Sequence, residues 1–181
     1  MLGVVYTSFI EMVEEKFSPE IADQLLANPQ LQYGGIYTAV GSYEHHDIIR
    51  MAIHLSEISG IPADDLVPAF GEYLFHQLVQ RYPQMIEDCH SMLDLLQGIE
   101  TSIHTQVRAL YPSASLPSFE CIREADNHLV MQYESKRPFV NLALGLIQGA
   151  ANHYGQQYEI EVVRARDNED NKASFYITTQ P

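Results

Sequence analysis

Apolar residues change their spacing once along this chain, near Pro112, and this change constrains the fold more than any other feature of the sequence. Before it they recur every three or four residues, the spacing of a helix with one buried face. After it they alternate with polar residues, the spacing of a strand with one buried face. The pattern predicts the α+β class, with a helical N-terminal portion followed by a four-stranded antiparallel sheet in ββαββ order.

Turn and capping residues divide the first part of the chain into helices. Pro19, preceded by a serine, is typical of a helix start, and Ser42 is a candidate cap for a later helix. Gly60 is expected to end that helix, Pro68 to kink or restart the next one, and Gly98 to mark a bend. The predicted helices span residues 2–16, 19–27, 42–59, 62–80, 84–96 and 99–110.

Turn residues also organise the second part, after the tract "YPSASLPS". A hairpin is expected around "ADN", then a helix from Pro138 to Gly155, then a second hairpin around "NEDN". The length of 181 residues favours one domain, spanning 1–181. The predicted strands span residues 118–124, 128–136, 158–167 and 173–180.

The charge balance limits the partners that this chain can have. It carries 24 acidic residues against 10 basic ones, a formal net charge of −14. Binding to nucleic acid or to an anionic membrane requires an excess of Lys and Arg, so neither is expected as a partner. A local basic pocket for one small anion remains compatible with this charge.

The cysteines and the N-terminus indicate the compartment. The two cysteines, Cys89 and Cys121, are too few for a disulfide framework or a zinc site. Glutamates appear too early for a signal peptide, and no apolar run approaches the ~20 residues that cross a bilayer. We therefore expect a cytoplasmic protein with reduced thiols.

His104 is the histidine with the most informative position. It lies beside Ile103 in the apolar stripe of its predicted helix, in line with Val107 and Tyr111, and so faces the interior. Taken alone, a core histidine satisfied by hydrogen bonds is the better interpretation. The sharper interpretation is an axial ligand to haem iron, because an apolar surround suits a porphyrin.

Glu87 and His90 offer a competing metal site. Their spacing of three residues is that of di-iron helix bundles, which require a second Glu-x-x-His unit and two more glutamates. The chain contains no second unit, so chance spacing is favoured. A non-haem di-iron enzyme stays an alternative at this point.

Three polar residues end a core-facing row of apolar ones. Tyr133, Ser135 and Arg137 continue the alternation of the strand and therefore project from one face. Hydroxyls and a guanidinium together suit a carboxylate or a phosphate, and a buried Arg needs an anion. An edge-strand Arg that reaches solvent is an equally good interpretation, and a metal-free module that binds an organic anion is a third alternative function.

These residues in register resemble the haem-nitric oxide/oxygen binding (H-NOX) family. The Tyr-x-Ser-x-Arg pattern is weak alone, but here it follows a helical His104 and Pro117 and precedes a ββαββ end. The resemblance covers essentially the whole chain. It includes the segments "MLGVVYTSFIEMV", "AFGEYLF", "IHTQVRALYP", "LPSFEC" and "LALGLIQG".

The resemblance implies a cofactor and a set of contacts. Haem b (iron protoporphyrin IX) would lie between a distal helical lobe, about 1–60, and a proximal lobe, about 61–181. His104 would bind the iron and Pro117 would press on the porphyrin, with no zinc site. The propionates would contact Tyr133, Ser135 and Arg137, and the remaining haem or ligand-pocket residues would be Val5, Phe9, Leu74, Leu142 and Leu146.

The resemblance also implies which gas is sensed and how. Leu142 stands where oxygen-binding members carry a tyrosine, so the distal pocket offers no donor to dioxygen and a nitric oxide sensor is expected. Nitric oxide, with carbon monoxide as a further ligand, would bind opposite His104 and weaken its bond to iron. The chain would then act as a regulator without catalytic activity, resembling stand-alone bacterial domains that control a histidine kinase or a cyclic-di-GMP enzyme.

Overall fold

The structure is a computed structural model that describes residues 1–165 and 170–180. No helix within these ranges has both the length and the apolar composition needed to cross a membrane. The helical elements are α1 (Gly3–Lys16), α2 (Pro19–Leu26), α3 (His46–Ser59), α4 (Ala63–Arg81), the 3-10 turn η1 (Pro83–Met85), α5 (Met92–Gly98), the π-helical turn η2 (Ile99–Ile103), α6 (His104–Leu110) and α7 (Val140–His153).

The strands form one antiparallel sheet, as the alternation predicts. They are β1 (Ser118–Ala125), β2 (His128–Glu134), β3 (Tyr158–Arg164) and β4 (Lys172–Thr179), in the order β1-β2-β4-β3. The predicted α+β class and the ββαββ order are confirmed, because α7 separates the two hairpins in the chain. The turn expected at "NEDN" falls partly on residues 168 and 169, which lie outside the described residues.

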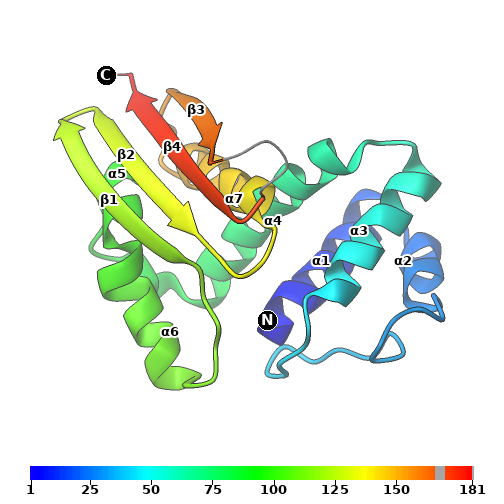
Figure 1. The fold of residues 1–181 in the computed structure, drawn as a ribbon. Coiled ribbons are helices and arrows are strands. Elements are labelled where there is room, and N and C mark those ends of the chain that lie inside the picture. Colours follow the sequence, from blue (N-terminus) through cyan, green and yellow to red (C-terminus); the bar gives the residue numbers. More distant parts are fainter. Residues whose placement is uncertain (166–169, 181) are drawn as a thin grey trace.

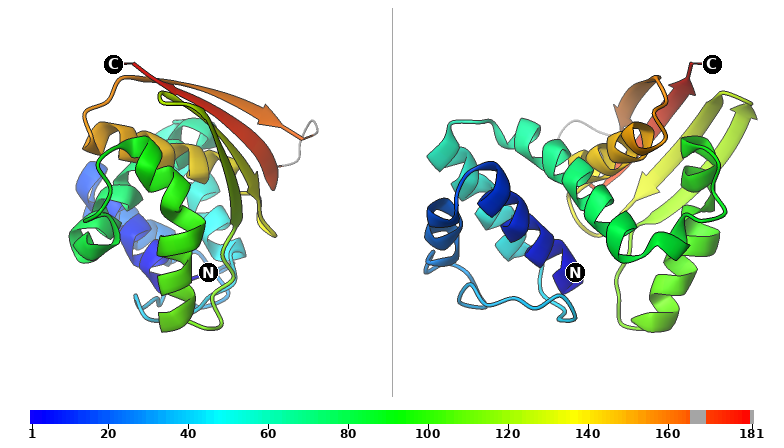
Figure 2. Two further views of the ribbon diagram at one scale, coloured as in Figure 1. Left: turned by 90° about the vertical axis from the view of Figure 1, so that its left-hand side faces the viewer. Right: turned by 180° about the vertical axis from the view of Figure 1, so that it is seen from behind.

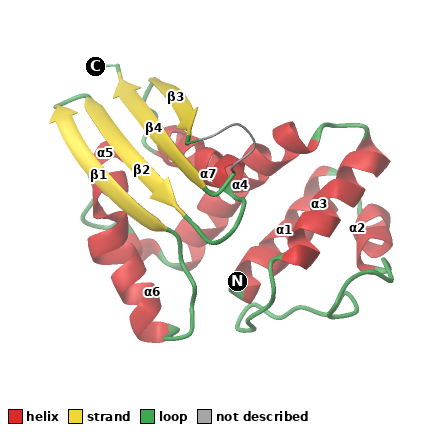
Figure 3. Cartoon of the chain, in the orientation of Figure 1, coloured by secondary structure: helices red, strands yellow, loops and turns green. Residues whose placement is uncertain are grey.

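The elements gather into two groups that share helices α4 and α7. Helices α1, α2 and α3 lie together on one side, and all four strands lie on the other (Figures 1 and 3). The view from behind shows α4 passing between the two groups (Figure 2). One apolar core contains Tyr6, Phe9, Leu55, Phe70 and Leu74 among others, and a second contains Leu96, Met131, Ile147 and Phe175 among others.

Three glycines, Gly71, Gly145 and Gly149, allow α4 and α7 to cross at very short range. A Cβ atom added to Gly145 of α7 would lie 2.0 Å from the carbonyl oxygen of Pro68, and one added to Gly71 of α4 would lie 2.7 Å from the Cα of Gly145. One added to Gly149 would lie 2.7 Å from the Cβ of Phe75. At these three positions only glycine fits, and the crossing is where the two cores meet.

Two predicted helix boundaries in the first half are wrong. Ser42 does not cap a helix, because it pairs with Leu2 in an isolated bridge while the Gly3 N–H donates to the carbonyl of Gly41. Helix α3 therefore begins only at His46. The predicted helix over 84–96 is replaced by η1 and by α5, whose true cap is Ser91, with its hydroxyl accepting from the backbone N–H of Asp94 at 3.1 Å.

The predicted restart at Pro68 and the predicted bend at Gly98 are also absent. Helix α4 continues through Pro68 from Ala63 to Arg81, because its packing along α7 outweighs the one backbone hydrogen bond that proline cannot make. Gly98 has helical torsions, φ −84° and ψ −7°, and the chain passes from α5 into η2 without a bend. The N–H of His104 then donates to the carbonyl of Ile99, the wider bonding of a π-helical turn.

Asp47 organises the loop before α3 and gives the fold a testable dependence on pH. Its side chain is almost fully buried and accepts from the backbone N–H groups of Gln32 and Tyr33, the hydroxyl of Tyr37 and the guanidinium of Arg50. Burial alone would raise the pKa of Asp47, but these donors together hold it below its usual value. The carboxylate is thus favoured in the folded state.

Asp47→Asn is expected to lower the free energy of unfolding near neutral pH by about 2–4 kcal/mol, because an amide cannot accept from all of these donors. The folded-state pKa is depressed, so the stabilisation is complete above the unfolded-state pKa of about 4 and is lost as the pH falls through the folded-state pKa. Urea unfolding across this acid range measures both effects. The exposed Asp23 supplies the control, since Asp23→Asn should change neither.

Candidate functional site

A predominantly apolar cavity of about 310 Å³ lies between the two groups of elements. The N-terminal residues, α4, α7, the helical segment α5–η2–α6 and the loop before β1 all contribute to its wall. Nearly all of the residues singled out from the sequence meet here. They are Val5, Leu74, His104, Pro117, Tyr133, Ser135, Arg137, Leu142 and Leu146.

His104 occupies the first position of α6, where the η2 turn delivers it to the cavity wall with 9% of its surface exposed. Its Nδ1 lies 2.9 Å from Oε2 of Glu100. Burial lowers the pKa of His104, against the opposing effect of the Glu100 carboxylate. Because a carboxylate can only accept, Nδ1 carries the proton and Nε2 keeps a lone pair for a ligand.

Tyr133, Ser135 and Arg137 lie at one edge of the cavity, although β2 ends at Glu134. Tyr133 is 4% exposed, and burial raises the pKa of its phenol. The backbone N–H of Ser135 donates to the carbonyl of Asn171 at 2.8 Å, which extends the chain past the strand. The Arg137 guanidinium donates to the carbonyl of Ser115 at 2.6 Å and forms no ion pair with the carboxylates of residues 1–165 and 170–180.

Phe9 is the one predicted pocket residue that the structure places elsewhere. It is 2% exposed and packs edge-on against Phe70, with ring centroids 5.0 Å apart, inside the core to which α1, α2, α3 and α4 contribute. Val5 lies one helical turn earlier and reaches the cavity, whereas Phe9 faces the neighbouring helices. Sequence spacing placed both on one face but could not show how deep each lies.

The hydroxyls of two tyrosines in the N-terminal group of helices donate hydrogen bonds away from the cavity. The Tyr6 hydroxyl donates to the carbonyl of Glu44, and the Tyr37 hydroxyl donates to Asp47 at 2.8 Å. The rings stack with centroids 4.5 Å apart. Neither residue lines the cavity, so neither hydroxyl supplies a donor there.

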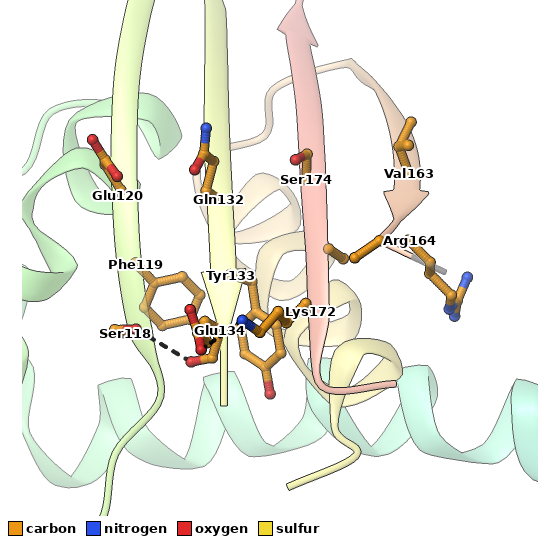
Figure 4. A pocket seen from close by; sticks show the side chains of 12 residues that line it. Ser118, Phe119, Glu120, Gln132, Tyr133, Glu134, Val163, Arg164, Lys172 and Ser174 are labelled. Atoms are coloured by element: carbon orange, nitrogen blue, oxygen red, sulfur yellow. Dashed lines mark hydrogen bonds and ion pairs between the residues drawn. The ribbon is translucent and has the colours of Figure 1, made fainter. Parts of the chain in front are cut away.

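A second and more open hollow lies on the outer face of the sheet, away from α5 and α7 (Figure 4). Side chains of all four strands line it, and the ion pair between Lys172 and Glu134, 2.8 Å long, crosses one end. Glu120 and Gln132 give it a polar surface. Of the residues predicted for the site it touches only Tyr133, so it is not where they converge.

Glu87 and His90 do not form the helical pair that a di-iron site needs. Both are exposed in the irregular segment between η1 and α5. In the described part of the chain, the one group of three side chains close enough to share an ion is Glu44, His45 and His46, at the start of α3 and distant in sequence from both. A di-iron carboxylate centre therefore lacks its framework here.

Comparison with known proteins decides between the remaining interpretations. Residues 2–162 match the sequence profile of the haem-NO-binding family, HNOB. The chain belongs to this family. It is therefore an H-NOX haem-binding gas-sensor domain rather than a catalytic enzyme.

Solved H-NOX structures share the fold of this H-NOX domain. An H-NOX protein from S. oneidensis in the Fe(II)NO ligation state superposes with a TM-score of 0.91 at 25% identity, with 100% of each chain covered. The IWP-051-bound H-NOX from Shewanella woodyi in the Fe(II)CO state is 38% identical, with a TM-score of 0.85 over 100% of this chain and 95% of that one.

A curated relative is much longer than this H-NOX domain. Soluble guanylate cyclase gcy-33 of Caenorhabditis elegans is 24% identical over 171 residues, which make up 92% of this chain. The same match spans 18% of the cyclase. What the similarity covers is thus the domain and not the cyclase as a whole.

The residues of this H-NOX domain fit the haem that such domains bind. The cavity has an apolar lining for a porphyrin, an imidazole with a free Nε2 in its wall, and a guanidinium without a carboxylate partner among the described residues at its edge. A haem presents an apolar disc, an iron and two carboxylates, which match these three features. The donor set therefore suits haem rather than a free metal ion.

Sequence reasoning missed several residues of this H-NOX site. Glu100 was passed over, although a carboxylate four residues before a buried histidine shares its helical face and is a detectable signal. Phe119, whose ring centroid lies 5.6 Å from that of His104, could have been found as an inward residue of β1. Other cavity residues, at the end of α4 and around η1, have no sequence pattern that would mark them, because only the tertiary fold brings them to the cavity. They include Leu78, Val79, Tyr82, Met85 and Ile86.

Proposed function

We propose that this domain is a nitric oxide sensor that holds haem b between its two groups of elements. The observation that carries the proposal is the position of His104, with Nε2 free, in the wall of an apolar cavity whose edge is lined by Tyr133, Ser135 and Arg137. His104 would bind the iron, and those three side chains would bind the propionates. Pro117 would press on the porphyrin.

The composition of the N-terminal side of the cavity supports nitric oxide as the preferred gas. Val5, Leu74 and Leu142 are apolar, and the hydroxyls of Tyr6 and Tyr37 are bonded elsewhere. Iron-bound dioxygen gains from a hydrogen-bond donor in the distal pocket, whereas nitric oxide needs none. Carbon monoxide is a further ligand of the same site, since the S. woodyi H-NOX was solved in that state.

The signal would leave the site through His104 and the segments that hold it. His104 would hold the iron of the haem, the haem would supply the binding site for nitric oxide, and weakening of the iron–His104 bond would start the signal. Release of His104 would free η2 and α6, which contact β1 through Glu100 and Phe119, and the groups of elements would rotate about α4 and α7. A change between two arrangements of a packed interface is what a ligand switch requires.

We propose that a partner protein in the cytoplasm reads this change, either a histidine kinase or a cyclic-di-GMP enzyme. The net charge of −14 suits a partner with a basic docking surface. A relative of this domain, gcy-33, is named a soluble guanylate cyclase, which supports a nucleotide-converting enzyme as the class of partner.

Absorption spectra of the purified protein test the proposal. The reduced protein is expected to show a Soret band of five-coordinate ferrous haem. Nitric oxide should convert it to a five-coordinate nitrosyl form, because the iron–His104 bond breaks. Air should give no stable oxygenated spectrum, because the side chains of Val5, Leu74 and Leu142 offer no hydrogen-bond donor to bound dioxygen.

Two results would contradict the proposal. A stable oxygenated spectrum in air would show that a donor reaches the bound gas after all. A nitrosyl form that remains six-coordinate would show that His104 is not released. As a control, nitric oxide is removed and the protein is kept in the ferrous state. Its spectrum should then return to that of the reduced protein before nitric oxide was added.

A further inference from the structure

Glu100 lies four residues before His104, and both of its carboxylate oxygens are occupied. Oε2 lies 2.9 Å from Nδ1 of His104 and accepts from the backbone N–H of Phe119 at 3.3 Å. Oε1 accepts from the guanidinium of Arg108. This one carboxylate therefore connects η2, α6 and the start of β1 at the residue expected to hold the iron.

The local backbone brings Glu100 to this position. Residues 99–103 form a π-helical turn, in which the N–H of His104 bonds to the carbonyl of Ile99, and the Thr105 hydroxyl donates to the carbonyl of Glu100 at 3.2 Å. Turns of this kind are rare in proteins, and many of those that do occur lie at functional sites. The turn, the ion pair with Arg108 and the bond from β1 together restrict the carboxylate to one place.

The contact with Nδ1 has a chemical consequence for the other ring nitrogen. An N–H that donates to a carboxylate fixes the tautomer and the orientation of the ring and makes the second nitrogen a stronger electron donor. A backbone carbonyl or a water in the same place would donate less negative charge. By this principle, the contact with Glu100 orients the ring and makes Nε2 more basic than it would be without the carboxylate.

We propose that Glu100 is a positioning residue that strengthens the bond between His104 and haem iron and so sets how readily a gas releases that bond. This inference rests on the proposed function, because it requires His104 to be the iron ligand. Arg108 moderates the effect, since its guanidinium shares the negative charge of the same carboxylate. Phe119 passes any movement of Glu100 to β1.

Glu100→Gln tests the proposal, because the amide keeps the shape of the side chain and removes its charge. The iron–histidine stretching frequency of the ferrous protein, measured by resonance Raman spectroscopy, is expected to fall. The rate of haem transfer to excess apomyoglobin should rise about 10-fold or more. Conversion of the six-coordinate to the five-coordinate nitrosyl form should also become faster, as measured by stopped-flow absorption.

Glu120→Gln is the matched control, because Glu120 is exposed on the outer face of β1 and contacts no part of the cavity. It should leave all three measurements at the wild-type values. An unchanged stretching frequency in haem-loaded Glu100→Gln would overturn the proposal, and the proposed function would stand because haem and His104 are still bound. A wild-type protein without a Soret band would overturn the proposed function and this inference with it.

Arg108→Gln provides an independent variant should Glu100→Gln fail to fold. It leaves Glu100 on His104 and removes the guanidinium that shares its charge, so the stretching frequency is expected to rise. A frequency equal to that of the wild type would overturn the proposal. Opposite shifts in the two variants would identify the charge of the carboxylate, and not packing alone, as the cause.

Discussion

His104→Ala is expected to purify with little or no haem, and its absorption spectrum should lack most of the Soret band. The imidazole supplies the expected protein bond to iron, and the adjacent hydrogen bond to Glu100 holds the ring in one orientation. Loss of this bond should lower haem affinity at least about 10-fold. Removal of a residue that only hydrogen-bonds a metal ligand already lowers affinity by about this factor. Haem content per protein, from absorbance and a pyridine haemochrome assay, measures it.

His90→Ala is the control for this prediction, because His90 is exposed and lies between η1 and α5. It should retain the haem content of the wild type. A His104→Ala protein with full haem content would contradict the assignment of the iron ligand. Iron without haem in the wild type would favour the di-iron alternative, and the absence of any metal would favour a module that binds an organic anion.

Gly145→Ala is expected to destabilise the fold more than any surface substitution. Its Cβ would lie 2.0 Å from the carbonyl oxygen of Pro68 and 2.8 Å from the Cα of Gly71, and neither backbone atom can move without shifting a helix. Overpacking of this kind costs about 3 kcal/mol. The thermal midpoint of a chain of this length should then fall by about 6–12 °C.

Gly98→Ala is the matched control, since it makes the same chemical change within a helix. Gly98 has helical torsions, and a Cβ there meets no atom within 4 Å. The substitution should be neutral or stabilise the fold by up to about 1 kcal/mol, because it restricts the unfolded chain. Thermal unfolding of both variants should be compared at equal haem saturation. A Gly145→Ala midpoint equal to that of the wild type would show that α4 and α7 do not cross as closely as described.

Part of the site could be predicted because its residues lie close together in sequence or follow a regular period. His104 is placed by its helical stripe, and Tyr133, Ser135 and Arg137 by alternation along a strand. Periodicity reports which face a side chain occupies, which is enough for these four. Their roles toward haem stay predictions that the proposed spectra and variants test.

The remainder of the site depends on depth and on distant segments. Phe9 shares a helix with Val5, yet Phe9 packs against Phe70 inside a core while Val5, at the margin of the same core, also lines the cavity. Ser42 has the composition of a helix cap but pairs with the N-terminal residue Leu2. Local preferences of about 1 kcal/mol, such as a cap, are outweighed when a distant segment offers backbone hydrogen bonds.

The sequence by itself determined the order of helices and strands, the ββαββ end, and the two patterns that carry His104 and Arg137, because these follow from the period of apolar residues along a local stretch. Only the tertiary structure decided that the two patterns face one cavity, that Glu100 holds His104, and that Gly145 lets α4 and α7 meet. These features are distances between groups fixed by packing in three dimensions, and a linear spacing of residues does not specify them.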